Sequence, residues 1–212
     1  MAAQKSPRGH RPPQARGRLL ALRAALVLGF ALALAPPLAL PLRSAPPEPE
    51  WSPAFEYQVK VGFLYNFTKF VEWPPDAFAG PGAPLIIGVL GSGSFCDALE
   101  ASLKDKTVNG RPIAVRRFRR PEDLTPTQVL FISPSLGREV GRLLKSLERA
   151  PVLTVGDMDR FASLGGIINF TIRDHRVGFE VNIDAASRAG LRISSQLLTV
   201  ATVVRDATGG TR

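Results

Sequence analysis

Alternating apolar and polar residues mark two consecutive strands near the end of the chain. Residues 168–172 read Ile-Asn-Phe-Thr-Ile, and residues 177–183 read Val-Gly-Phe-Glu-Val-Asn-Ile. A period of two on both sides of a short polar break is typical of two paired strands with one buried face. With the turn at residues 174–175, Phe170 lies opposite Phe179, and one register satisfies both faces. We therefore predict a closing antiparallel hairpin.

Helical spacing of aromatic residues begins the folded region. Apolar side chains recur every three or four positions from residue 54 to residue 73, at Phe55, Val59, Phe63, Phe67 and Phe70. Glu56 and Lys60 form an i,i+4 pair on this helix, and Pro74 with Pro75 ends it. Such a helix is typical of a core element. The alternative is a partner or ligand groove that uses its Tyr65, Asn66 and Trp73.

Short apolar runs alternate with helical segments through the middle of the chain. The expected strands are 85–90, 113–118, 129–132 and 152–155, and the expected helices are 94–103, 136–147 and 157–164. After the hairpin, helices are expected at 184–189 and from 194 to 204. Uninterrupted apolar strands are covered on both faces, and their alternation with helices implies crossover connections. The fold class is therefore α/β, a mostly parallel sheet with a C-terminal antiparallel hairpin and helices on both faces.

A glycine turn follows the strand at 85–90. It reads Gly91-Ser92-Gly93-Ser94 and leads into the next expected helix. A strand, a glycine turn and a helix N-terminus can together hold an anion on backbone N–H groups. The third glycine of the dinucleotide fingerprint is absent, as is the lysine of a Walker motif. Two interpretations stay open: a tight connection, or a ligand-binding site at these four residues.

The charge of the chain is concentrated in its first 45 residues. The net charge is +9, but this segment holds seven basic residues and no acidic one. The remainder carries 20 basic and 18 acidic residues, which is nearly balanced. A nucleic-acid-binding domain needs its positive charge on the folded surface, so we expect no nucleic-acid partner.

The start of the chain has the pattern of an export signal. A basic segment precedes an uncharged run at 24–35, and prolines follow it. This pattern predicts a signal peptide over residues 1–35. An uncleaved anchor extending to Leu42 is the alternative, although prolines interrupt that stretch and a spanning helix needs about 20 apolar residues. We expect a Pro-rich linker at 36–53, one α/β domain at 54–206 and a disordered tail at 207–212.

The exported part of the chain lacks the residue sets that catalysis would require. It holds one histidine, His175, and one cysteine, Cys96, and no GxSxG motif or metal-ligand spacing. We therefore expect no enzyme, no catalytic residue, no metal and no cofactor. Glu180 stands between apolar neighbours, and the hairpin register places it opposite Asn169. We expect a structural hydrogen bond from Glu180 to Asn169 or to a nearby arginine.

Six motifs, in order, resemble the YfiR family of exported bacterial proteins. They lie at residues 63–74, 87–95, 109–118, 129–133, 151–157 and 165–198. The resemblance covers nearly all of residues 54–204 and implies a Rossmann-like periplasmic domain without catalytic activity. The best-understood members bind the periplasmic part of an inner-membrane diguanylate cyclase and inhibit it. Release, in those systems through an outer-membrane lipoprotein, raises cyclic di-GMP and promotes biofilm formation.

The resemblance also suggests candidate contact residues. The polar or amphipathic residues within the matched motifs are Tyr65, Asn66, Lys69, Arg111, Arg176 and Glu180, and we expect these to bind the partner. A homodimer is compatible with this expectation. The alternative function is a periplasmic small-molecule sensor with a different signalling partner. Its pocket would lie at the carboxyl ends of the strands, at Gly91, Ser92, Gly93 and Ser94.

Two departures from the resembled family concern its regulation. Those members carry paired cysteines whose disulfides respond to redox conditions, whereas this chain has only Cys96. Redox sensing by an intramolecular disulfide therefore does not carry over. Gly178 also stands where many members have a basic residue.

Overall fold

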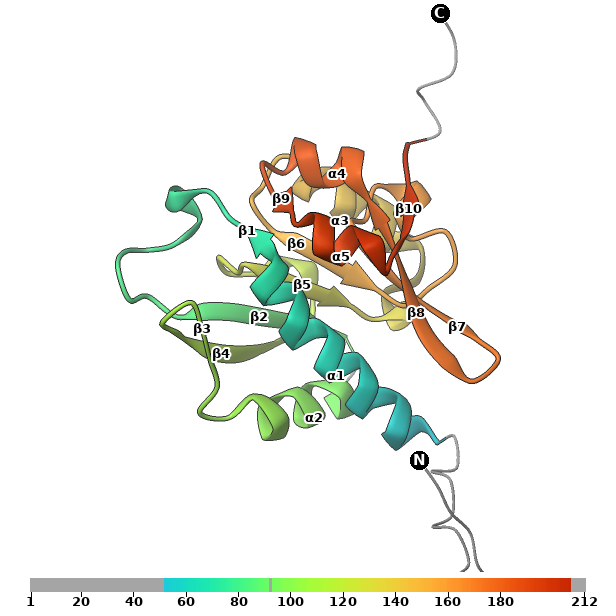
Figure 1. Cartoon of the computed structure of the whole chain (residues 1–212), viewed down its shortest axis with the longest axis horizontal. Helices are drawn as coiled ribbons and strands as arrows, with labels where there is room; N and C mark the ends of the chain where they lie inside the picture. The colour runs from blue at the N-terminus through green and yellow to red at the C-terminus, as the bar shows by residue number, and fades with distance from the viewer. Residues whose placement is uncertain (1–51, 92, 207–212) are drawn as a thin grey trace, which may run out of the picture. The chain divides into compact units, whose positions relative to one another are not determined.

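The computed structural model describes residues 52–91 and 93–206. The expected signal peptide, the expected tail and most of the expected linker lie outside these residues. Within the described part, eight strands form one mixed sheet in the order β10-β8-β7-β6-β5-β2-β4-β3 (Figure 1). The strands are β2 (Leu85–Leu90), β3 (Thr107–Val108), β4 (Arg111–Phe118), β5 (Val129–Ile132), β6 (Leu153–Gly156), β7 (Ile168–Arg173), β8 (Arg176–Asn182) and β10 (Thr202–Val204).

The pairing of the strands confirms the predicted fold class. The pairs formed along the order β4-β2-β5-β6-β7 are parallel, as is the pair of β8 and β10, whereas β3 pairs antiparallel with β4. β7 pairs antiparallel with β8, and Phe170 faces Phe179 while Asn169 faces Glu180, as the alternation predicts. The chain places β4 on one side of β2 and β5 on the other, so the direction of winding changes between β2 and β5.

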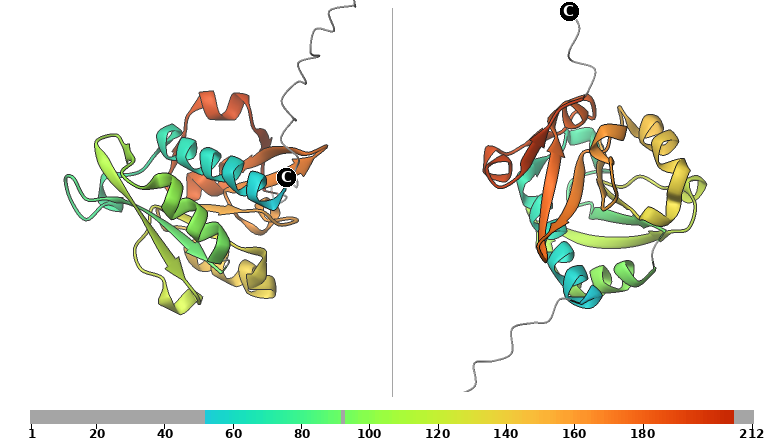
Figure 2. Two further views of the ribbon diagram at one scale, coloured as in Figure 1. Left: turned by 90° about the horizontal axis from the view of Figure 1, so that it is seen from below. Right: turned by 90° about the vertical axis from the view of Figure 1, so that its right-hand side faces the viewer.

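Helices cover both faces of the sheet (Figure 2). They are α1 (Pro53–Phe70), α2 (Gly93–Leu103), α3 (Val140–Leu147), α4 (Ile183–Arg188) and α5 (Ser195–Thr199). One apolar core joins α1, α2, α4 and α5 to the sheet and contains Ile87 and Phe131. The other core joins α3 to the opposite face and contains Leu90 and Ile132. Neighbouring strand residues therefore serve different cores, which explains why the apolar runs are uninterrupted.

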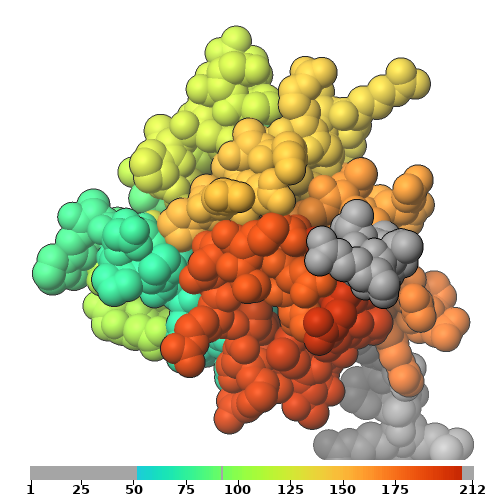
Figure 3. Space-filling view, turned by 90° about the horizontal axis from the view of Figure 1, so that it is seen from above, coloured from blue at the N-terminus to red at the C-terminus, as the bar shows by residue number. Residues whose placement is uncertain are grey.

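Helix α1 begins where the sequence predicts but ends three residues earlier. The Ser52 hydroxyl caps it by accepting from the backbone N–H of Phe55 at 3.2 Å. The helix stops at Phe70 because strand β1 (Val71–Glu72) pairs antiparallel with β9 (Arg192–Ile193). This pairing joins distant parts of the chain, and residues 71–84 border the α4–α5 segment in Figure 3.

Other helix predictions were wrong in extent. The expected helix 136–147 is a 3₁₀ segment (Pro134–Glu139) followed by α3, because Gly137 leaves the helical conformation with a φ of 56°. Of the expected helix 157–164, only Ala162–Leu164 forms a 3₁₀ turn. The expected last helix 194–204 divides into α5 and strand β10, whose residues bond to the open edge of β8.

Replacing Gly166 with alanine should destabilise the fold by about 1–3 kcal/mol. The ring of Phe161 is fully buried, and a Cβ atom at Gly166 would overlap its Cε1 and Cδ1 atoms. Gly62→Ala is the matched control, because Gly62 is at an exposed position of α1 and a Cβ atom there would meet nothing within 4 Å. We expect that change to stabilise by about 0.5–1 kcal/mol. Urea unfolding measures both, and equal effects would contradict the proposed overlap.

Candidate functional site

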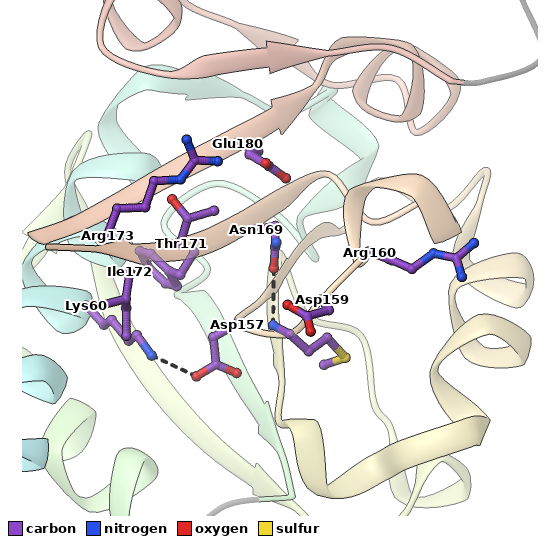
Figure 4. A pocket seen from close by; sticks show the side chains of 11 residues that line it. Lys60, Asp157, Asp159, Arg160, Asn169, Thr171, Ile172, Arg173 and Glu180 are labelled. Atoms are coloured by element: carbon purple, nitrogen blue, oxygen red, sulfur yellow. Dashed lines mark hydrogen bonds and ion pairs between the residues drawn. The ribbon is translucent and has the colours of Figure 1, made fainter. Parts of the chain in front are cut away.

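A polar pocket of about 430 Å³ lies beside the β7–β8 hairpin (Figure 4). It is located at the carboxyl end of β6, past which the neighbouring strand β7 extends. The carboxyl ends of parallel strands are the usual place for a ligand in an α/β fold. The charged and amide side chains that line it come from α1, the turn after β6, and both hairpin strands. They are Lys60, Asp157, Asp159, Arg160, Asn169, Arg173 and Glu180.

A buried ion triad forms the floor of the pocket. The Lys60 ammonium donates to Glu56 Oε1 at 2.5 Å and to Asp157 Oδ2 at 2.8 Å, and Lys60 is only 2 % exposed. Burial acts to lower the pKa of Lys60, but the hydrogen bonds and charges of Asp157 and Glu56 outweigh it and hold the pKa above its usual value. Lys60 is therefore a permanent cation that ties α1 to the end of β6.

Asp157 is the less satisfied member of the triad. Burial raises the pKa of its carboxyl, the nearby charge of Glu56 adds to this, and Lys60 only partly opposes it. One ammonium cannot neutralise two carboxylates, so the triad has an excess negative charge. The second carboxylate oxygen, Asp157 Oδ1, is buried and has no hydrogen-bond partner within the described residues. A buried carboxylate oxygen without a donor is uncommon and calls for a functional explanation.

The wall of the pocket carries the pair that the hairpin register predicts. Asn169 is buried, and its side-chain oxygen accepts from the backbone N–H of Met158 at 3.3 Å. Glu180 is partly buried on the facing strand, and its expected hydrogen bond to Asn169 or to an arginine is not found among the described residues. The carboxylate of Glu180 therefore faces the pocket without a partner from residues 52–91 or 93–206 (Figure 4).

Four of the six candidate partner residues gather near the C-terminal end of α1. Tyr65 donates its hydroxyl to the Thr107 carbonyl at 3.2 Å, and the Lys69 ammonium lies 4.0 Å from the centre of the Tyr65 ring. Asn66 and Lys69 are exposed. Lys69 and Arg111 line a second pocket of about 320 Å³.

The remaining contacts of these candidates show what each can offer a partner. Arg111 donates to the Gly80 and Ala83 carbonyls at 3.0 and 2.8 Å and lies over the Phe78 ring. Its guanidinium therefore secures the loop before β2. Arg176 is exposed at the end of the hairpin, whereas Glu180 lies in the polar pocket. The six candidates thus form two groups, one near Lys69 and one on β8.

The glycine turn lies at the point where the winding of the sheet reverses, between β2 and β5. A Cβ atom at Gly91 would lie 2.6 Å from the Ser135 hydroxyl, and one at Gly93 would lie 3.0 Å from the Arg117 guanidinium. Ser92 lies outside the described residues. Serine hydroxyls and one guanidinium therefore surround the described part of the turn.

Cys96 should react with thiol reagents at least about 100-fold more slowly in the folded protein than in the unfolded chain. Its thiol is fully buried in α2, and burial raises its pKa although Arg117 opposes this. The raised pKa reduces the fraction of reactive thiolate, and burial keeps the reagent from the sulfur. Labelling with a chromogenic disulfide, with and without denaturant, measures the ratio. Equal rates would show that α2 opens readily.

Sequence reasoning missed the pocket floor. The sequence predicts Lys60 only as half of an i,i+4 pair and Asp157 only as the start of the expected helix 157–164. In the structure the two side chains form an ion pair, although they are 97 positions apart in the sequence. A signal was present for Lys60, because it occupies the same helical stripe as Leu64, Phe67 and Val71, all of which are buried. No local pattern indicates Asp157 as its partner.

Neither a candidate metal site nor a membrane-spanning helix is found within the described part of the chain. No group of three or more His, Cys, Asp or Glu residues in 52–91 and 93–206 is placed to hold a metal ion. No helix over those same residues is both long and apolar enough to cross a membrane.

A family model described as YfiR/HmsC-like matches residues 57–202. The chain belongs to the YfiR/HmsC-like family. Members of this family are periplasmic, non-catalytic regulators of diguanylate cyclase signalling, and the match confirms the resemblance found in the sequence.

Two solved structures show weaker likeness to this YfiR/HmsC-like protein. One is a conserved domain protein from Vibrio cholerae O1 biovar El Tor strain N16961, with 12 % identity and a TM-score of 0.49, covering 69 % of this chain and 59 % of its own. The other is the ABC domain from Streptococcus pneumoniae in complex with L-Trp, with 12 % identity and a TM-score of 0.47, covering 70 % and 60 %. The YfiR/HmsC-like chain thus spans less than two thirds of either protein, and we draw no function from them.

Proposed function

We propose that this protein is exported by its N-terminal signal peptide, binds the periplasmic part of an inner-membrane diguanylate cyclase and holds that enzyme inactive, which lowers cyclic di-GMP. The observation that carries the proposal is the family match over residues 57–202, which spans almost the whole described domain. An inhibitor of this kind must bind one conformation of the cyclase more tightly than the other. Its effect is limited by that difference in affinity.

We propose the exposed end of α1 as the first contact surface. Lys69 lies over the Tyr65 ring, which orders an otherwise flexible side chain before any partner arrives. Asn66 is exposed beside it, and Arg111 holds the adjoining loop through its two carbonyl contacts. Pre-ordered aromatic and basic groups are typical of residues that dominate binding energy.

We propose the outer part of β8 as the second contact surface. Arg176 is exposed there, and Glu180 follows four residues later on the same strand. An outer-membrane lipoprotein that competes for either surface would release the cyclase. A homodimer could use the surface that the cyclase leaves open.

A small-molecule sensor with a different signalling partner is the second candidate function. The observation in its favour is the position of Gly91, Gly93 and Ser94 at the reversal of the sheet, where α/β proteins bind ligands. Ser92 belongs to the same turn in sequence. Ser133, Ser135 and Arg117 would supply the polar contacts in such a site.

Deletion of the gene combined with affinity capture tests the proposed function. We expect cyclic di-GMP to rise in the deletion strain and a diguanylate cyclase to co-purify with the tagged full-length protein from solubilised membranes. Lys69→Glu and Arg176→Glu should each reduce the captured cyclase at least about tenfold. Arg142→Glu is the matched control, because Arg142 is exposed on α3, which packs on the opposite face of the sheet from α1. Unchanged cyclic di-GMP without a captured cyclase would refute the proposal.

A further inference from the structure

The polar pocket beside the hairpin has acidic groups in excess of the donors that the protein gives them. Asp157, Asp159 and Glu180 all line it. Of these three, only Asp157 has an ionic partner within the described residues, and that partner, Lys60, is shared with Glu56. The inner end of the pocket therefore attracts positive charge.

Asp157 lines the pocket and has one oxygen without a hydrogen-bond partner among the described residues. One oxygen of this carboxylate accepts from Lys60, whereas Oδ1 is buried without a donor among the described residues. Rotation about the Cβ–Cγ bond, which is soft for aspartate, can bring either oxygen to a donor arriving from the pocket. A cation bound there would neutralise the excess charge of the triad.

The two basic side chains at the rim lie differently. The Arg160 side chain extends away from the pocket, while the Arg173 guanidinium lies on the side of the hairpin that carries Glu180 (Figure 4). Neither arginine takes part in an ion pair among the described residues. Arg173 is therefore available to pair with a carboxylate on a ligand, because it forms no ion pair with the acidic residues of the pocket.

We propose that this pocket binds the protonated primary amine of a small molecule, with the ammonium group donating to the carboxylates of Asp157 and Glu180. An ammonium group has three donors and no acceptor, and it matches a site whose unused groups are carboxylate oxygens. A volume of about 430 Å³ is within the range of small-molecule sites. The inference does not rest on the proposed cyclase partner.

Two sources could supply such an amine, and a matched set of probes distinguishes them. Putrescine carries amines without a carboxylate, ornithine has the same carbon chain with a carboxylate added, and N,N′-diacetylputrescine has no charge. We expect calorimetric titration of the purified protein from the full-length gene to detect putrescine or ornithine but not the diacetyl compound. Tighter binding of ornithine, lost in Arg173→Gln, would assign the site to amino acids. Putrescine binding at least as tight as ornithine would assign it to diamines.

Glu180→Gln is the decisive variant, because it removes a charge from the pocket wall and leaves the triad intact. We expect it to weaken amine binding at least about tenfold, whereas Glu72→Gln, at an exposed site with 74 % of its side chain accessible, should change nothing. Asp157→Asn should abolish binding, and a thermal unfolding scan shows whether that variant still folds. No binding of either amine at about 10 mM, or unchanged binding by Glu180→Gln, would overturn the proposal.

Discussion

Replacing Lys60 with methionine should lower the free energy of unfolding by about 3–5 kcal/mol. The substitution keeps roughly the length of the side chain but removes its charge. The lost cation is buried, since the Lys60 side chain is only 3 % exposed, and water cannot take its place. Glu56 and Asp157 would then lie close together at the end of β6 without a counter-charge. Urea unfolding monitored by circular dichroism measures the change.

The pH dependence of the same variant separates lost charge from lost packing. Without Lys60, burial and the nearby charge of Glu56 raise the pKa of Asp157 unopposed, and a carboxyl whose folded-state pKa is raised loses stability as pH rises through that pKa. The deficit of Lys60→Met should therefore be largest at pH 7 and shrink toward about pH 4, where the Asp157 carboxyl holds a proton. A deficit that does not change with pH would indicate packing instead.

Two further variants serve as controls for the buried charge. Glu56→Gln, Lys60→Met and Asp157→Asn combined should recover most of the loss, because an uncharged set leaves no isolated ion. Lys69→Met, at an exposed position of the same helix, should change stability by no more than about 0.5 kcal/mol. Equal losses at positions 60 and 69 would contradict a special role for the triad.

The hairpin and the parallel strands could be predicted because their evidence is local. Alternation within residues 168–183 specifies which side chains share a face, and this determined the pairing of Phe170 with Phe179. The uninterrupted apolar runs at β2 and β5 reflect two cores, one on each face of the sheet.

The parts that local patterns missed depend on distant partners. Val71 and Glu72 continue the apolar and polar spacing of α1, yet they extend because Arg192 and Ile193 pair with them. β10 continues the pattern of α5 in the same way, but β8 offers an open edge to it. Propensity is a weak guide where such tertiary contacts compete with it.

The candidate site also has a part that local sequence predicts and a part that depends on distant residues. The glycine turn and the register of Asn169 with Glu180 follow from adjacent sequence, and the structure places both at the ends of strands. The pocket floor could not be predicted, because the Lys60–Asp157 pair joins α1 to β6 across most of the domain. A lysine on an otherwise buried helical stripe was the available signal, and only the fold supplies its second carboxylate.

Replacing Phe67 with alanine should cost about 3–5 kcal/mol of stability and also disturb the pocket. Phe67 is fully buried in α1, its ring centre lies 5.7 Å from that of Phe170 and 5.0 Å from that of Phe179, and these two residues belong to the two hairpin strands. Truncation leaves a cavity beneath the hairpin that rigid neighbours cannot fill.

The position of Phe67 also links its loss to the geometry of the pocket wall. Asn169 and Glu180 are the chain neighbours of Phe170 and Phe179, so the aromatic contacts set where the pocket wall lies. We therefore expect amide hydrogen exchange in Phe67→Ala to accelerate more across β7 and β8 than across β2 and β5. Val200→Ala, at a residue that is 70 % exposed, should change neither stability nor exchange. Equal acceleration across the whole sheet would show that the loss is one of general stability, and would contradict a specific role of Phe67 in placing the pocket wall.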